Sequence, residues 1–153
     1  MVFGKPGSTT VDLANLGGGG FRIDGFDEGD EAGHSVSGAG DVNGDGLADL
    51  IVGAPNAEGG GFTVDGNPRA GESYVVFGKT TSTPVDLGNL GTDGFRLDGI
   101  DSGDYSGDSV SGAGDDNGDG MADVIIGAPW AANLAGESYV VFSASTSPAI
   151  ATY

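Results

Sequence analysis

A long internal repeat constrains this chain more than any other feature. The segment Phe21–Glu58 returns as Phe95–Ala132, 74 residues later, with 26 identities in 38 positions. Beyond it the shift falls to 65 residues, because Ala70–Phe77 returns as Ala135–Phe142. The nine extra residues of the first copy lie within Asn56–Arg69, where we expect a glycine-rich surface loop. Self-similarity of this kind is typical of proteins in which copies of one structural unit pack side by side.

The copies are made of short β-branched runs separated by Gly, Asp and Asn. Gly accounts for 32 of the 153 residues, but no three-residue glycine period appears, which excludes collagen. Runs such as Leu50–Val52 and Tyr74–Phe77 predict short strands joined by tight turns. No stretch has the apolar spacing of a helix over three turns. We therefore expect an all-β protein with almost no helix.

Each copy predicts four strands. A segment between the third and fourth strands also repeats, as Val11–Gly17 and Val85–Gly91, and we expect its two Leu residues to plug the edge of the sheet. The first strand is made of Ser, Gly, Ala and Val, and such small residues suit the innermost strand of a radial arrangement. The predicted ranges, in strand order, are about 34–39 and 108–113, 48–53 and 122–127, 72–77 and 137–142, and 21–25 and 95–99.

Charge and cysteine content exclude several classes of partner. The formal net charge is −18, which would repel nucleic acid and anionic membrane surfaces. The absence of cysteine excludes disulfides and thiolate metal sites. The N-terminal sequence has no apolar core of signal-peptide length, and no segment has the composition of a membrane span. We expect an extracellular or cell-surface protein that either reaches its compartment by another route or, in the interpretation that we favour, is longer than this chain.

Oxygen-bearing side chains recur at alternate positions between the first and second strands of each copy. The segments Asp41–Asp49 and Asp115–Asp123 place oxygen-bearing side chains at positions 1, 3, 5 and 9, with Gly at position 6 for a sharp turn. Calcium takes about six to eight oxygen ligands, and alternate positions of a curled loop can converge on it. We therefore expect two Ca²⁺ ions per chain. The predicted ligands are Asp41, Asn43, Asp45, Leu47 and Asp49 in the first loop, and Asp115, Asn117, Asp119, Met121 and Asp123 in the second, with Leu47 and Met121 acting through their carbonyls.

Other metal sites fit this pattern less well. Zinc is disfavoured because neither loop contains Cys or His, and magnesium because it requires a strict octahedron and keeps its waters. EF-hand and dockerin loops place an acidic ligand at position 12 and continue into a helix. Here position 12 is Val52 or Ile126, inside a β-type apolar run.

The first copy resembles the FG-GAP repeat. The resemblance rests on Gly33–Gly46 followed by Asp49–Pro55, and on the flanking segments Tyr74–Lys79 and Gly94–Gly99. FG-GAP repeats occur in the β-propeller of integrin α subunits and in bacterial surface proteins, and the flanking segments are similar to the bacterial branch. The resemblance implies that each repeat is one propeller blade and that the Asp-rich loops hold calcium on one face.

Ligand-contacting loops of this family usually lie on the opposite face. The resemblance assigns that position to 26–33, 100–107, 56–69 and 130–135. One departure from the family pattern is that Ala32-Gly33 and Ser106-Gly107 replace its Phe-Gly pair, so the resemblance supports no claim about packing between blades at that point.

Other candidate residues favour structural roles. His34 is the only His, and its counterpart in the second copy is Asp108, so we expect a solvated or packed side chain. Trp130 could stack on a sugar, although packing against a neighbouring loop is the interpretation we favour. The acidic cluster Asp27–Glu31 could supply the carboxylate pair of a glycoside hydrolase, but its second copy keeps fewer acids. We find no nucleophile motif and expect no catalytic residues.

These observations predict a non-enzymatic, calcium-binding β-propeller module that acts as a protein-interaction or adhesion scaffold. A lectin-like carbohydrate binder is the alternative, and a fragment of a propeller-based hydrolase is a third possibility. The similarity of the copies fits either a recent duplication or an engineered repeat. We expect N-terminal strands over 1–25, blades over 26–99 and 100–143, and a tail over 144–153.

The order of the strands predicts self-assembly. Val2–Gly4 matches a third strand and Phe21–Gly25 a fourth, while the second copy reaches Phe142 without a fourth strand. Two blades cannot close a propeller, which needs about four to eight. We therefore expect the strand at 21–25 to complete the last blade of a neighbouring copy. The resemblance favours a trimer of six blades over a tetramer of eight, because the family has seven, and residues 1–4 or 137–142 would be displaced.

Overall fold

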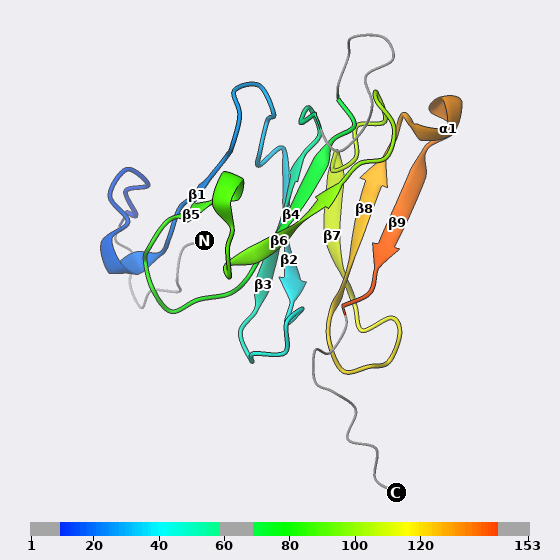
Figure 1. The fold of residues 1–153 in the computed structure, drawn as a ribbon. Coiled ribbons are helices and arrows are strands. Elements are labelled where there is room, and N and C mark those ends of the chain that lie inside the picture. Colours follow the sequence, from blue (N-terminus) through cyan, green and yellow to red (C-terminus); the bar gives the residue numbers. More distant parts are fainter. Residues whose placement is uncertain (1–9, 59–68, 144–153) are drawn as a thin grey trace, which may run out of the picture.

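The computed structural model describes residues 10–58 and 69–143, which form an all-β structure. Two antiparallel sheets stand side by side, each with its strands in chain order (Figure 1). The first sheet contains β2 (Ser35–Gly40), β3 (Asp49–Ala54), β4 (Glu72–Val76) and β6 (Gly94–Asp98). The second contains β7 (Ser109–Gly114), β8 (Asp123–Ala128) and β9 (Glu137–Val141).

All seven strands of these two sheets begin and end within one residue of their predicted ranges. The eighth predicted strand, at 21–25, differs: within it only β1 (Ile23–Asp24) is paired, in parallel, with β5 (Val85–Asp86). The alternation of this segment explains its placement: Phe21 is buried and Ile23 packs against the same cluster, while Arg22 forms an ion pair with Asp24. The segment therefore lies on the outer face of the first sheet.

Helical structure is confined to three short turns in the described residues. They are the 3-10 turns η1 (Gly17–Gly19) and η2 (Leu87–Asn89) and the single turn α1 (Ala131–Leu134). Ala132 and Asn133 have φ of 52° and 57°, so α1 is a tight loop and not a regular helix. The prediction of almost no helix is confirmed.

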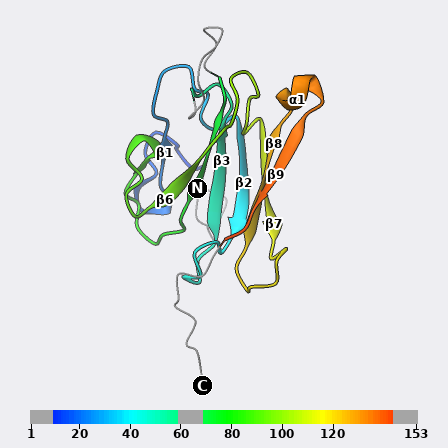
Figure 2. The same cartoon turned by 45° about the vertical axis from the view of Figure 1, so that its right-hand side comes forward.

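The two sheets pack face to face around an apolar core. Ile51 and Val75 of the first sheet meet Val124 and Ile126 of the second, with Ala39 beside them. Strands β2 and β7 lie side by side along this contact (Figure 2). A side chain at Gly112 would bring its Cβ within 2.7 Å of the Gly38 carbonyl oxygen, which explains why the first strands carry such small residues.

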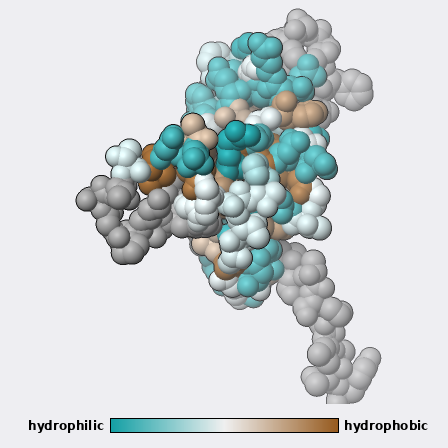
Figure 3. Space-filling model, turned by 90° about the vertical axis from the view of Figure 1, so that its left-hand side faces the viewer, coloured by the Kyte–Doolittle hydropathy of each residue, from teal (hydrophilic) through white to brown (hydrophobic). Residues whose placement is uncertain are grey.

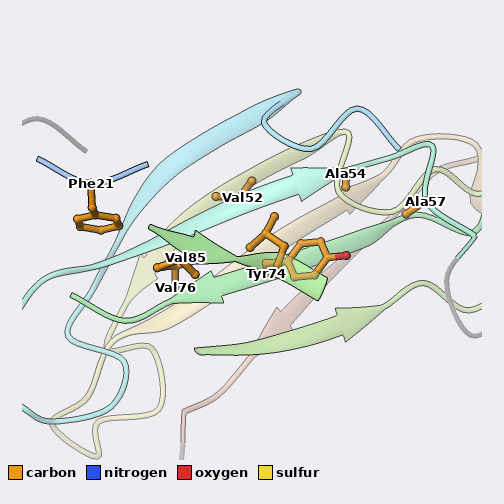
Figure 4. Packing of buried hydrophobic residues seen from close by; sticks show 8 residues of the cluster. Phe21, Val52, Ala54, Ala57, Tyr74, Val76 and Val85 are labelled. Carbon is orange, nitrogen blue, oxygen red and sulfur yellow. The ribbon is translucent and has the colours of Figure 1, made fainter. Parts of the chain in front are cut away.

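A second core covers the outer face of the first sheet. Phe21, Val52, Tyr74 and Val76 pack there against Val85 (Figure 4). Leu87 is also buried in this cluster and Leu90 is packed against it, so the segment 85–91 packs on the outer face of the sheet, whereas the sequence predicted a plug at its edge. Seen from this side, the surface is mainly hydrophilic, with small hydrophobic patches between the polar side chains (Figure 3).

Some sequence predictions fall outside the described residues. These are the strand at 1–4, most of the glycine-rich loop at 56–69 and the tail at 144–153. Within 10–58 and 69–143, no helix is long and apolar enough to cross a membrane.

Candidate functional site

The two Asp-rich loops lie at the same end of the neighbouring sheets. Each connects a first strand to a second, β2 to β3 or β7 to β8, at the lower end of the view in Figure 1. The loops at 26–33, 100–107 and 130–135 lie at the upper end. The fold thus separates the two Asp-rich loops from a second loop surface, which contains the acidic cluster Asp27–Glu31.

Hydrogen bonds hold the first loop in a tight curl. The Asp41 carboxylate accepts bonds from the amides of Gly44, Asp45 and Gly46 at 2.8, 3.0 and 2.9 Å. Asn43 accepts from the Asp45 amide at 2.9 Å and donates to its carboxylate at 2.9 Å. Gly44 and Gly46 have φ of 75° and 86°, a region that residues with a side chain rarely adopt.

The second loop repeats this arrangement. Asp115 accepts from the amides of Gly118, Asp119 and Gly120 at 2.7, 3.0 and 2.9 Å. Asn117 pairs with Asp119 through both its carbonyl and its amide nitrogen, at 2.8 and 3.2 Å. The repeated sequence therefore specifies one loop conformation twice, with positions 1, 3 and 5 gathered around a single turn.

The position-9 carboxylates are fully buried and brace each loop against its sheet. Asp49 accepts from the amides of Val42 and Gly78 at 2.8 and 2.7 Å. Asp123 accepts from the amides of Asp116 and Ser143 at 2.8 and 3.0 Å.

These two carboxylates titrate differently. Burial raises the pKa of Asp49, and the two amide bonds offset only part of that effect. Burial also acts to raise the pKa of Asp123, but hydrogen bonds from Ser143, Asp116 and Asn117 outweigh it and hold the pKa below its ordinary value. The Ser143 hydroxyl, at 3.4 Å, is a donor that Gly78 lacks in the first loop.

Sequence reasoning missed two contributions to this surface. Gly78 and Ser143 each follow a third strand and donate to the position-9 carboxylate, a role that their matched positions in the repeat could have indicated. The two loops also touch, because the Ala122 amide donates to the Asp41 carbonyl at 3.0 Å. The contact depends on how the sheets pack, so no local pattern signals it.

The donor set of the loops is suited to calcium by its chemistry. Carboxylate and amide oxygens at positions 1, 3 and 5 surround one turn. The negative charge of Asp45 also acts to raise the pKa of Asp49. Leu47 is exposed and Met121 is half-buried at position 7. Among residues 10–58 and 69–143, however, no group of three or more His, Cys, Asp or Glu side chains is close enough to hold a metal ion. Asp49 and Asp123 are directed to backbone amides.

The upper loops carry the other candidate residues. His34 lies 3.4 Å from Glu31 and 3.7 Å from Asp108, and its side chain is 44% exposed. Trp130 is 56% exposed and packs against Tyr105, with ring centroids 5.6 Å apart and ring planes tilted by 43°. Both side chains contact neighbouring side chains, in agreement with the structural roles expected from the sequence.

In the acidic segment 27–31, burial raises the pKa of Asp30. Its counterpart Asp104 shows the same direction, again because of burial. A raised pKa on one carboxyl of each loop does not by itself make the catalytic pair that a glycoside hydrolase needs.

The sequence is similar to a known repeat family and to two known proteins. The FG-GAP repeat family matches residues 32–76. A phosphatidylinositol-glycan-specific phospholipase D of Dictyostelium discoideum is 32% identical over 120 residues, which cover 71% of this chain and 12% of that protein. Integrin alpha-PS2 of Drosophila melanogaster is 34% identical over 122 residues, covering 77% and 8%. The chain spans about a tenth of the length of these relatives. With its antiparallel sheets in blade order, the chain is therefore a protein of integrin-like FG-GAP repeats that fold as β-propeller blades.

Proposed function

We propose that the two Asp-rich loops each bind one calcium ion. The observation that carries the proposal is the loop conformation itself, which gathers the oxygens of positions 1, 3 and 5 around one turn in both copies. Asp41, Asn43, Asp45 and Asp49, with the Leu47 carbonyl, would hold the first ion. Their counterparts Asp115, Asn117, Asp119, Met121 and Asp123 would hold the second. Bound calcium would neutralise carboxylates that otherwise repel one another across a short loop.

Calorimetric titration with calcium tests this proposal. We expect two ions per chain, with dissociation constants of roughly 10⁻⁴–10⁻³ M as in other extracellular sites. Asp45→Ala or Asp119→Ala should weaken its own site at least about tenfold, because each removes a central carboxylate. Asp116→Ala is the matched control, since this exposed residue at position 2 offers its amide, not its carboxylate, to the loop. Equal losses from all three variants would contradict the ligand assignment.

The module as a whole would act as a surface scaffold for protein interaction or adhesion, without catalysis. Its integrin relative and its acidic surface support this role, and the upper loops would contact the partner. The phospholipase D relative does not extend that activity to this chain, which covers 12% of its length. An extracellular or cell-surface location follows from the same proposal. Adhesion of cells to a surface coated with the protein, lost on chelation, is the expected result.

A lectin-like function is the second candidate, and Trp130 is the observation in its favour. This side chain packs against Tyr105 in a tilted arrangement yet leaves 56% of its surface exposed among the upper loops, and exposed aromatic faces can stack on sugars. If the module binds glycans, Trp130→Ala should abolish signals on a glycan array while leaving calcium binding unchanged. An array without signals for the unmodified protein would eliminate this candidate.

A further inference from the structure

Strands β4 and β9 have the same sequence but different surroundings. Both read Glu-Ser-Tyr-Val-Val. All five residues of β4 are buried, whereas three of the five residues of β9 are exposed. On the face in question, Tyr74 and Val76 are fully buried, whereas their counterparts Tyr139 and Val141 are only half-buried. Identical residues differ in this way only when one sheet has a cover that the other lacks.

The cover of the first sheet is the segment 85–90. Val85 and Leu87 are buried against Val52, Tyr74 and Val76, as Figure 4 shows for Val85. Val85 also pairs with Ile23. The ring of Phe26 lies directly on Gly88, where a Cβ would come within 2.2 Å of it.

The matching place on the second sheet is an apolar pocket of about 160 Å³. Five residues that line this pocket each have a counterpart on the first sheet, where the segment 85–90 covers it. In order, Leu97, Ile100, Ile126, Tyr139 and Val141 correspond to Ile23, Phe26, Val52, Tyr74 and Val76. The pocket is thus the uncovered form of a site whose occupant is known from the same molecule.

The chain carries a second copy of that occupant. Residues 11–17 repeat the covering segment 85–91. Asp12 accepts a hydrogen bond from the Ala14 amide at 2.9 Å, just as Asp86 accepts from Gly88 at 2.9 Å, so the local turn is already formed. Leu13, however, is 72% exposed, whereas Leu87 is 4% exposed.

The residues at the contact also match in size. On the first sheet a large ring, Phe26, meets Gly88. On the second, the smaller Ile100 stands in the place of Phe26, and it would meet Ala14 in the place of Gly88.

Charge complementarity extends the match to the strand edge. On the first sheet β6 pairs with β4 in a register that sets Arg96 opposite Tyr74, and the Arg96 guanidinium lies 3.4 Å from Glu72. The counterparts are Arg22 and Glu137, both exposed. A strand at 22–24 placed beside β9 in the same register would therefore set Arg22 next to Glu137.

We propose that residues 11–24 of one copy of this chain complete the second sheet of another copy. Val11 and Leu13 fill the pocket, and residues 22–24 add the fourth strand beside β9. The donor segment also remains packed on the first sheet of its own chain. Strand β6 has the same double role, because it belongs to the first sheet and at the same time covers the second. Figures 1 and 2 show β1 and β9 at opposite sides of the molecule, so the segment that carries β1 does not cover the second sheet of its own chain. A head-to-tail contact of this kind repeats until it closes into a ring.

Light scattering of the whole chain in calcium, across a concentration series, tests the assembly. With 15.0 kDa per chain, a ring of three copies has a mass of about 45 kDa and a ring of four about 60 kDa. We expect the trimer, and either closed ring supports the proposal. A 15.0 kDa species at every concentration up to the millimolar range would overturn it.

Leu13→Asp tests the pocket contact. The side chain is exposed in the single chain, so the fold should survive, but a charge would enter the apolar pocket. We expect the concentration for half-assembly to rise at least about tenfold. Leu134→Asp is the matched control, because Leu134 is 71% exposed and lies outside the pocket lining. An unchanged ring for Leu13→Asp, or an equal loss for Leu134→Asp, would contradict the proposal.

A charge exchange tests the strand register. Arg22→Glu and Glu137→Arg should each weaken assembly by placing like charges side by side. The double variant should recover most of the loss, because it restores an ion pair with the signs exchanged. Additive losses in the double variant would show that these residues do not meet, and would overturn the pairing of 22–24 with β9.

Discussion

At the scale of single residues, the Asp-rich loops combine two kinds of carboxylate. Asp45 and Asp119 are exposed on the curl, while Asp49 and Asp123 are buried and joined to backbone amides. In the proposed calcium sites the exposed carboxylates would hold the ion, whereas the buried ones also brace the fold. Ser143 in place of Gly78 gives Asp123 an additional hydroxyl donor; hydrogen bonds together hold the pKa of Asp123 below its ordinary value, whereas burial raises the pKa of Asp49.

Two alanine variants should separate these roles. With chelator present, Asp49→Ala should lower the free energy of unfolding by at least about 2 kcal/mol, because the buried amides of Val42 and Gly78 lose their acceptor. Asp45→Ala should change it by less than about 0.5 kcal/mol, since its loop is exposed. Urea denaturation measures both values. Equal destabilisation by the two variants would show that burial does not distinguish them.

At the scale of elements, the contact between the two blades requires small residues where the backbone of one blade closely approaches the backbone of the other. Gly53 lies in β3, where a Cβ would come within 2.0 Å of the Gly107 carbonyl oxygen in the second blade. Ser35 of the first blade donates to the same carbonyl at 2.8 Å. The contact between blades thus depends on glycine and serine as well as on the apolar core.

Gly53→Ala should therefore loosen the contact between blades. We expect a loss of about 1–3 kcal/mol in the free energy of unfolding, because the added methyl group meets backbone that cannot move aside. Gly38→Ala is the control: it lies in β2, and its Cβ would meet nothing within 4 Å in a single chain. Measured at concentrations where the chain is monomeric, it should be neutral or slightly stabilising. A neutral Gly53→Ala would indicate that the blades can separate without cost.

At the scale of the whole molecule, the net charge opposes compact folding. A net charge of −18 on 153 residues favours expansion by self-repulsion, and the loops concentrate part of it at one end. Two bound calcium ions would reduce the formal charge to −14. Ion binding to the folded state alone also adds stability by mass action.

Chelation should therefore lower the melting temperature by roughly 5–10 °C per site occupied at 100 times its dissociation constant. Restored calcium should recover the original curve. Sodium chloride at matched ionic strength is the control, because it screens the net charge without filling the loops. Recovery by sodium chloride alone would attribute the effect to general repulsion, and an unchanged curve with chelator would rule out coupled binding.

Local sequence signals are enough to predict the strands and the loop conformation. Short β-branched runs and turn residues are such signals, so seven strands were predicted to within one residue. The curl of 41–49 follows equally from local chemistry, because an Asp followed by Gly at positions 4 and 6 can satisfy its own backbone amides. This is also why both copies of the loop adopt the same conformation.

Which faces of the sheets are covered depends instead on tertiary packing. The sequence of β4 and β9 is identical, yet one is buried and the other is exposed, because burial depends on residues far away in the chain. The segments 11–17 and 85–91 show the same division: both form the same Asp-capped turn, but only Leu87 reaches a core. The turn is fixed by contacts two residues apart, whereas the core requires a neighbouring sheet in the right place.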